Sequence, residues 1–183
     1  MSRIGAVQPE QAEGKTKQLL DAVNRKLGLV PNMTRAMAAS PAVLESYLGF
    51  AGTIGGGKLG AKLGELIALT VAETNGCDYC LSAHTAIGGL MKIAPADLEA
   101  ARDAASGDAR IAAALAFARR IAEARGHVGD ADIAAARAAG FSDGELGEIV
   151  AHVALNFFTN LFNSVAATEI EFPRVSARLR KAA

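Results

Sequence analysis

Hydrophobic residues recur at intervals of three or four along most of the chain, which is the spacing of an amphipathic α-helix. In residues 11–28 this spacing places four residues on one stripe, and Gly28 is a typical helix stop: Leu19, Leu20, Val23 and Leu27. No segment shows the strict alternation that marks a half-buried strand. The pattern therefore predicts an all-α fold, a compact multi-helix domain with short connections.

Helix start and stop signals divide this pattern further. Pro41 after Ser40, Pro95, Asp130, and the pair Ser142 and Glu145 each mark a helix start. The glycines at 55–57 end one helix, and Gly76 ends the long apolar helix "KLGAKLGELIALTVAETN". The last helix is expected to be the longest and to run to about residue 169. None of the connections is long enough to separate domains, so residues 1–183 are expected to form a single domain.

One pair of segments suggests an internal repeat. Residues 63–86, "LGELIALTVAETNGCDYCLSAHTA", align without gaps on residues 146–169, "LGEIVAHVALNFFTNLFNSVAATE". On this alignment Asn160 and Asn163 stand where Cys77 and Cys80 stand. We hypothesise an ancient duplication with a two-fold helical repeat, whose second copy lost the thiols. The alternative is a chance match between two helices rich in alanine and leucine.

Composition and charge narrow the classes of function that the protein can have. Hydrophobic residues make up 51% of the 183 residues, which fits a globular domain with a sizeable core. The 19 basic and 19 acidic residues balance, which argues against a nucleic-acid partner or an anionic membrane surface. No secretory signal and no apolar run of membrane-spanning length is visible. We expect a cytoplasmic protein, in whose reducing surroundings a close cysteine pair indicates catalysis or metal binding.

Both cysteines of the chain lie in the stretch "GCDYCLSAH", residues 76–84. On a helix Cys77 and Cys80 share a face at i,i+3, close enough to form a disulfide. His84 follows Cys80 at i,i+4, one turn away. A helix start stabilises a thiolate, and a neighbouring imidazole lowers a thiol pKa further. This pattern predicts a redox-active dithiol with a proton acceptor at the start of a central helix.

Glu65 lies on the preceding helix. An antiparallel hairpin turning at Gly76 would return its carboxylate to His84, where it could hold the imidazole or relay a proton. Glu73 is nearer in sequence, but it lies beside the turn and is interpreted as a surface charge. Two alternatives stay open for the cysteine pair: a zinc site completed by His84 and Glu65, and a pair of inert buried thiols.

Other polar residues have plainer interpretations. His127 is a loop histidine, and His152, at i,i+4 from Glu148, is interpreted as a partly buried histidine that could also face a pocket. Asn156, Asn160 and Asn163 form a polar stripe that is typical of hydrogen bonds between helices. Tyr47 and Phe50 are expected to pack rather than bind.

At the positions Glu65, Cys77, Cys80 and His84 the sequence resembles the carboxymuconolactone decarboxylase-like superfamily, in its alkylhydroperoxidase D-type, peroxidase-related branch. The flanking segments "LGLVPNMTRAMAASPAVLESY" and "NFFTNLFNSVAATEIEFP" extend the resemblance over most of the chain. The resemblance implies an all-α homo-oligomer, a trimer or a hexamer. It also implies a peroxidase or disulfide reductase that acts on organic hydroperoxides without a metal or an organic cofactor.

By the same resemblance, Cys80 attacks the peroxide, Cys77 condenses with the sulfenic acid to give a disulfide, and Glu65 and His84 relay protons. A separate dithiol, protein or small molecule, restores the pair. Tyr79 stands where peroxidase members carry a histidine; a phenol of pKa ~10 is a poor base at neutral pH but can pass a hydrogen bond. Two alternatives remain: a decarboxylase or lactone-processing enzyme, and a non-enzymatic redox sensor or zinc-binding module.

Overall fold

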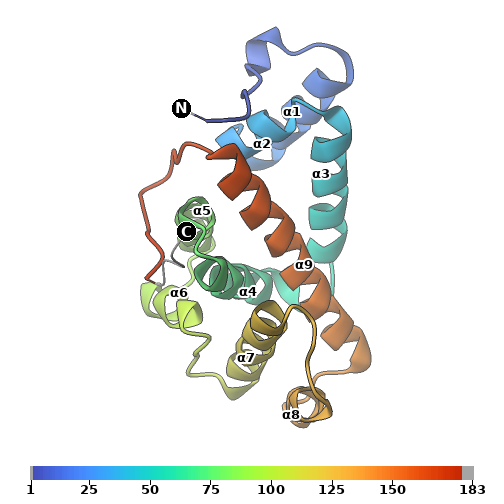
Figure 1. The fold of residues 1–183 in the computed structure, drawn as a ribbon, viewed down its shortest axis with the longest axis vertical. Helices are drawn as coiled ribbons and strands as arrows, with labels where there is room; N and C mark the ends of the chain where they lie inside the picture. The colour runs from blue at the N-terminus through green and yellow to red at the C-terminus, as the bar shows by residue number, and fades with distance from the viewer. Residues whose placement is uncertain (1, 179–183) are drawn as a thin grey trace.

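The computed structural model describes residues 2–178, and within that range the regular structure is helical with no strand (Figure 1). The prediction of an all-α fold is therefore confirmed. A short 3-10 turn, η1, spans Pro9–Gln11. The helices that follow in chain order are α1 (Gly14–Leu27), α2 (Asn32–Met37), α3 (Pro41–Gly55), α4 (Gly60–Asn75), α5 (Asp78–Leu90), α6 (Pro95–Arg102), α7 (Ala109–Ala124), α8 (Asp130–Ala138) and α9 (Asp143–Ala166).

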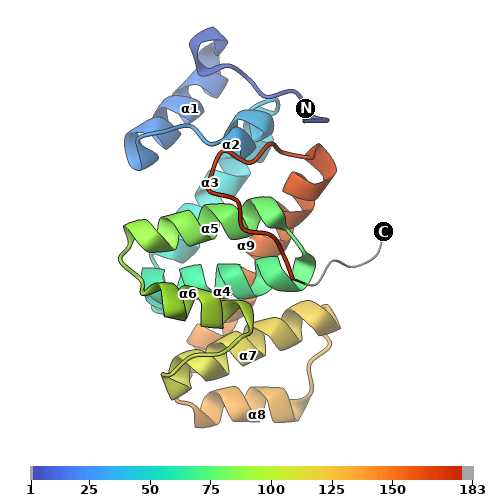
Figure 2. The same ribbon diagram turned by 90° about the vertical axis from the view of Figure 1, so that its left-hand side faces the viewer.

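Helix α4 lies at the centre of the molecule. It packs against α5, α6, α7 and α9, and its apolar residues Leu66, Ile67 and Leu69 are at most 1% exposed. Because neighbours surround it, α4 is hydrophobic on nearly all sides rather than along one stripe. Figure 2 shows α1–α3 at one end of the molecule, α4–α6 in the middle and α7–α8 at the other end. The site therefore sits in a region whose backbone is fixed by packing.

The turn between α4 and α5 places the cysteine motif. Gly76 adopts a left-handed conformation with φ of 71°, which a residue with a side chain rarely adopts, and so ends α4. Cys77 then serves as the N-cap of α5, and its sulfur accepts a hydrogen bond from the Cys80 N–H. The predicted hairpin, with the cysteines at the start of its second helix, is confirmed.

Several predicted helix ends also agree with the structure. Gly28 ends α1 in the left-handed conformation, and Ser142 and Glu145 form the predicted capping box at the start of α9. Helix α9 ends at Ala166, three residues before the expected end, because Ala167 turns into the left-handed region. These agreements follow from local chemistry that acts within one helical turn.

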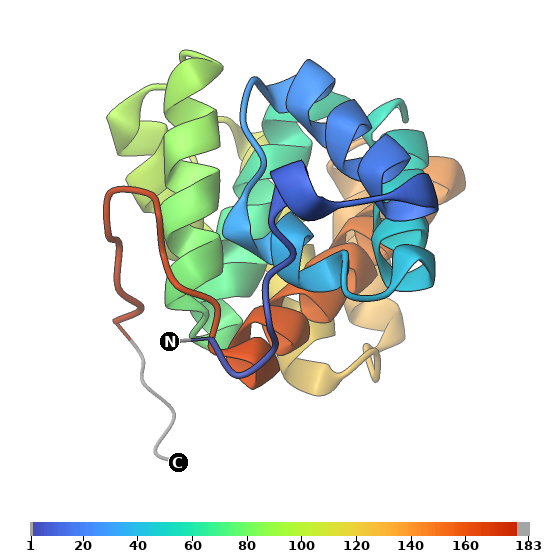
Figure 3. The ribbon, with the colours of Figure 1, turned by 90° about the horizontal axis from the view of Figure 1, so that it is seen from above.

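The main apolar cluster surrounds α4 and includes Ile149 of α9. The N-terminal helices form a second apolar cluster around Leu20, Met37 and Leu44, against which Phe162 of α9 also packs. Figure 3, seen from above, shows α1–α3 covering one end of the molecule. Helix α9 thus joins the two clusters. Its length and mean hydropathy of 1.3 match those of a membrane-spanning helix, a weak signal that buried core helices share.

The hypothesis of an internal repeat is wrong at the level of structure. Residues 63–86 bend at Gly76 into the α4–α5 hairpin, whereas residues 146–169 run on as one helix as far as Ala166. The first segment therefore forms two helices that run in opposite directions, whereas the second forms part of a single helix. The reason is local: Thr159, aligned with Gly76, keeps helical geometry, and no residue there adopts a left-handed conformation. The match reflects two similar apolar helices.

The interpretation of Glu73 as a surface charge is also wrong. Its side chain is 4% exposed and accepts hydrogen bonds from the Arg102 side chain and the Arg178 backbone N–H, each at 2.7 Å. Arg178 belongs to the segment after α9, which returns along α5 (Figure 3). Asp78 and Ser82 of α5 accept hydrogen bonds from backbone N–H groups of that segment. The prediction was wrong because a segment that is distant in sequence covers Glu73 at the end of α4.

Candidate active site

A cavity of about 440 Å³ lies between the N-terminal helices α1–α3 and the helices α4, α5 and α9. Most of its wall is apolar, with Val23, Leu48, Ile54 and Ile87 among the lining residues. Cys80 lies in this wall and Cys77 does not. The cavity is of the size that holds a small organic molecule, and of the two cysteines it places only Cys80 beside that molecule.

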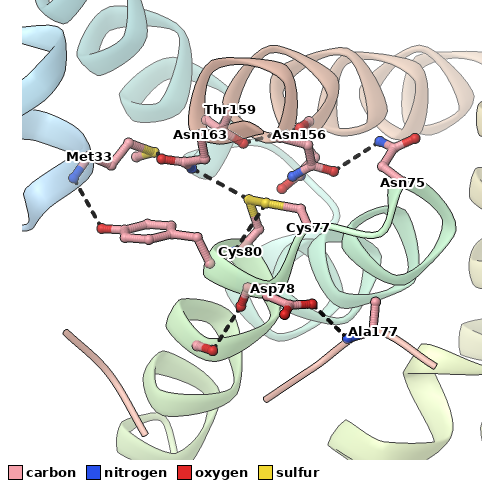
Figure 4. Close-up of a disulfide and its surroundings, with 12 residues drawn as sticks. Met33, Asn75, Cys77, Asp78, Cys80, Asn156, Thr159, Asn163 and Ala177 are labelled. Carbon is pink, nitrogen blue, oxygen red and sulfur yellow. Dashed lines mark hydrogen bonds between the residues drawn. A yellow bond between two sulfur atoms is a disulfide. The ribbon is translucent and has the colours of Figure 1, made fainter. Parts of the chain in front are cut away.

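The two cysteines form a disulfide (Figure 4). Their Cα atoms are 5.3 Å apart, as the i,i+3 spacing at a helix start allows. Both residues are buried, Cys77 at 3% and Cys80 at 2% exposure. The Cys80 N–H donates to the Cys77 sulfur at 3.3 Å, so the start of the helix interacts with Cys77 rather than with Cys80.

His84 and Glu65 meet as the hairpin predicted. The Nδ1 atom of His84 lies 2.7 Å from Oε1 of Glu65, and both residues line the cavity. Burial lowers the pKa of His84, but the negative charge of Glu65 and its hydrogen bond outweigh burial and raise the pKa above 6.5. The imidazole is thus fixed in orientation, and it binds a proton more tightly than a free histidine.

Tyr79 also lines the cavity, but its hydroxyl is already engaged. It accepts a hydrogen bond from the Met33 N–H at 3.1 Å and donates one to Glu171 at 2.9 Å. Burial raises the pKa of Tyr79; the Met33 N–H opposes this, and the charge of Glu171 raises it further. Tyr79 therefore remains a neutral phenol that ties α5 to α2 and to the segment after α9.

Asn163 contributes a contact that the sequence did not predict. Its Nδ2 atom lies 3.5 Å from the sulfur of Cys80 and 3.1 Å from the sulfur of Met33. Asn160, by contrast, accepts a hydrogen bond from Asn75 at 2.9 Å and bridges α9 to α4, as the polar stripe predicted. The regular spacing of asparagines on α9 was the only available signal, and it did not distinguish these two roles.

His152 faces the same cavity from α9, and His127 lies outside its wall, between α7 and α8. Burial lowers the pKa of His152, although the charges of Glu148 and Glu65 act in the opposite direction. The ring lies so close to α4 that a Cβ atom on Gly64 would come within 2.7 Å of it. Glycine at position 64 thus leaves room for a neutral histidine in the wall.

Tyr47 of α3 lines the cavity as well, whereas Phe50 of the same helix is 39% exposed. Burial raises the pKa of Tyr47, and the charge of Glu65 raises it further. The prediction that Tyr47 packs is compatible with this position, in which it forms part of the cavity wall. Among residues 2–178, no group of three or more His, Cys, Asp or Glu side chains is arranged to hold a metal ion.

The site thus defines a class of all-α proteins with a cysteine pair at the start of α5 and a paired histidine and glutamate beside it. Residues 41–124 match the family model of the carboxymuconolactone decarboxylase family. Over these residues the chain is similar to that family, which agrees with the resemblance carried by Glu65, Cys77, Cys80 and His84. A comparison with curated proteins gave no match.

Solved structures share the fold over nearly the whole chain. A peroxidase-related protein from Silicibacter sp. TM1040 is 27% identical with a TM-score of 0.79, covering 91% of this chain and 92% of that one. A peroxidase-related protein with an alkylhydroperoxidase AhpD core, from Ralstonia eutropha JMP134, is 24% identical with a TM-score of 0.84, covering 93% and 92%. A variant of the debrominase Bmp8, in complex with 2,3,4-tribromopyrrole, is 22% identical with a TM-score of 0.80, covering 93% and 92%.

Proposed function

We propose that the protein is a thiol-dependent peroxidase, or a disulfide reductase, that reduces organic hydroperoxides through a cycle between the Cys77–Cys80 dithiol and its disulfide. One observation carries this proposal: the apolar cavity ends on Cys80 and leaves Cys77 outside its wall. A nucleophile needs access to substrate, whereas a resolving thiol needs access only to the nucleophile. The arrangement therefore supports the same division of roles that the family resemblance implied.

In the proposed reaction His84, held by Glu65, accepts the thiol proton of Cys80. The thiolate attacks the terminal oxygen of the hydroperoxide, so an S–O bond forms and the O–O bond breaks. The alkoxide that leaves takes the proton back from His84 and departs as an alcohol. The raised pKa of His84 favours the pair of imidazolium and thiolate from which this step begins.

The thiol of Cys77 then attacks the sulfur of the Cys80 sulfenic acid. An S–S bond forms, the S–O bond breaks, and hydroxide leaves as water with the proton of Cys77. A dithiol donor, protein or small molecule, reduces the disulfide and is itself oxidised to a disulfide. Apart from this donor, protein residues carry the steps of the proposed cycle, which needs no metal or organic cofactor. We propose that it operates in the reducing cytoplasm.

Single-cysteine variants test the proposal. With dithiothreitol as the reductant and cumene hydroperoxide as the substrate, the wild-type protein should consume peroxide catalytically. Cys80→Ser should consume none and should form no sulfenic acid that dimedone can trap. Cys77→Ser should form one trappable sulfenic acid per chain and then stop. Sulfenic acid on Cys77 in the Cys80→Ser variant, or full turnover without Cys80, would contradict the assignment.

A second candidate is reductive dehalogenation of a small aromatic compound by the same dithiol. The apolar cavity beside Cys80 favours it, since the debrominase structure has the same fold and holds a brominated pyrrole. In this reaction the C–Br bond breaks, bromide leaves, hydrogen replaces it on carbon, and the dithiol becomes a disulfide. Reduced protein incubated with 2,3,4-tribromopyrrole should then release one bromide per disulfide formed, measured by ion chromatography. If peroxide is consumed but no bromide is released, the dehalogenase candidate is excluded and the peroxidase proposal stands.

A further inference from the structure

Asn163 occupies an unusual position for an amide side chain. It is 4% exposed and lies directly over the disulfide (Figure 4). The two hydrogen bonds of its Nδ2 group go to sulfur atoms, those of Cys80 at 3.5 Å and Met33 at 3.1 Å. Its Oδ1 atom has no hydrogen-bond partner among the described residues. The amide is therefore buried with weak acceptors on one side and no donor on the other.

A purely structural role does not explain this arrangement. A buried amide without full hydrogen bonding costs free energy, and neutral sulfur is a weak acceptor. Asn160, one turn earlier on α9, at least bridges two helices through Asn75. Asn156 is bonded back to the His152 carbonyl of its own helix. The Nδ2 group of Asn160 also lacks a partner, but only Asn163 directs its N–H groups at sulfur atoms, and its position becomes more favourable if one of those atoms becomes a strong acceptor.

Reduction of the disulfide creates such an acceptor. A thiolate carries a full negative charge, and a hydrogen bond to a charged group is about twice as strong as one between neutral groups. Cys77 has the N-terminal turn of α5 beside it, where the Cys80 N–H already donates to its sulfur. Cys80 lies inside the helix, with its own N–H used in that bond. Its sulfur therefore needs a donor from another element, and the Nδ2 group of Asn163 is within reach.

We propose that Asn163 is a further catalytic residue, whose amide N–H stabilises the Cys80 thiolate and so activates this cysteine for attack on substrate. The inference rests on the proposed function for its place in catalysis. Its chemical content, a donor to the Cys80 sulfur, is independent of which substrate the thiolate attacks. Asn163 complements His84: the histidine takes the thiol proton, and the amide stabilises the charge that remains.

The test measures the titration of Cys80 directly. In a Cys77→Ser background, with Cys80 as the remaining thiol, the pH dependence of alkylation by iodoacetamide gives the thiol pKa. Asn163→Ala and the volume-conserving Asn163→Leu should each raise that pKa by about one to two units, the equivalent of one hydrogen bond to a charged group. Asn163→Asp should raise it further because its carboxylate repels the thiolate. Asn160→Ala, which changes a neighbouring buried amide on the same helix, should leave it unchanged.

Other titratable groups around this wall stay in place in all these variants, so they do not account for a shift. They are Lys26 on α1, His84 and Tyr79 on α5, Glu65 on α4, Tyr47 on α3 and His152 on α9. An unchanged Cys80 pKa in Asn163→Leu, or an equal rise in Asn160→Ala, would overturn the inference. With both cysteines present, Asn163→Leu should also slow peroxide consumption at neutral pH about tenfold, as one pKa unit implies. If the wild-type protein consumes no peroxide, the proposed function is contradicted. The alkylation experiment would still decide whether Asn163 stabilises the Cys80 thiolate.

Discussion

The hydrogen bond between His84 and Glu65 sets the charge of the cavity wall. Two opposing effects meet at the imidazole: burial disfavours its charged form, and the neighbouring carboxylate favours it. The carboxylate prevails because it lies only 2.7 Å away, on a helix whose position packing has fixed. The charge state of His84 at neutral pH therefore depends on a residue 19 positions earlier in the chain.

Glu65→Gln should reverse the shift. Without the carboxylate only burial remains, so the pKa of His84 should fall from above 6.5 to below it. Titration of the histidine ring protons by NMR measures this, with His84→Gln to assign the signal. Glu45→Gln, on an exposed carboxylate that pairs with Lys15, is the control and should not alter it. A His84 pKa that stays above 6.5 in Glu65→Gln would contradict this account of the pair.

The same pair makes stability depend on pH. A pKa raised in the folded state means that the folded protein binds the proton more tightly, so the stabilisation is fully present below 6.5. It is lost as pH rises through the raised pKa of His84. The difference in unfolding free energy between wild type and Glu65→Gln should accordingly be larger at pH 6 than at pH 9. Urea denaturation at both values measures it, and a difference that grows with pH would argue against the assignment.

At the scale of elements, the segment after α9 holds the start of α5 in place. Tyr79 donates to Glu171, Asp78 accepts from the Ala177 N–H, and Ser82 accepts from the Val175 N–H. Phe172 packs edge-on against the Tyr79 ring. The cysteine helix is thus fixed both by α4 beneath it and by an irregular segment above it, which suits a site whose sulfur atoms must keep their positions through a redox cycle.

Glu73 anchors this segment to the helical core. Glu73→Ala should lower the free energy of unfolding by about 3–5 kcal/mol, because it removes the buried carboxylate that pairs with the buried guanidinium of Arg102. Glu99→Ala is a matched control, since Glu99 pairs with the same Arg102 but is 58% exposed; it should cost no more than about 1 kcal/mol. Chemical denaturation of both variants measures the difference. Equal losses would mean that burial of Glu73 contributes little.

At the scale of the whole molecule, α9 exposes an apolar stripe on the side away from the core. Val150, Phe158, Leu161 and Val165 are between 36% and 63% exposed and follow helical spacing. An exposed stripe of this kind needs cover, and we propose a second copy of this chain as the cover, since the family resemblance implies a trimer or a hexamer. The buried side of the same helix carries Asn163, so such an interface would also hold the site in position.

Light scattering after size exclusion should therefore show a homo-oligomer at micromolar concentration. Leu161→Glu, which places a charge in the stripe, should shift the protein towards the monomer. Leu90→Glu is the control, because Leu90 is 83% exposed and belongs to the end of α5 rather than to the stripe on α9. The proposal would be contradicted if the wild-type protein were a monomer, or if both variants dissociated to the same extent.

Sequence pattern alone determined the features that depend on neighbours within a helical turn or two. The spacing of apolar residues determined the helices, and Gly76 determined the turn that brings Glu65 back to His84. The spacing of Cys77 and Cys80 at a helix start determined a pair close enough for a disulfide. Each follows from helix geometry and backbone sterics, which a short window of sequence specifies.

Packing between distant segments decided the rest. Asn163 is 83 residues from Cys80, Tyr79 is 92 from Glu171, and Glu73 is 105 from Arg178, so no local pattern pairs them. The same packing left Cys80 rather than Cys77 in the cavity wall. Helical periodicity fixes which side of each helix is apolar, but not which helix that side meets. The contacts that define this site depend on which helices pack together, and only the tertiary structure decided that.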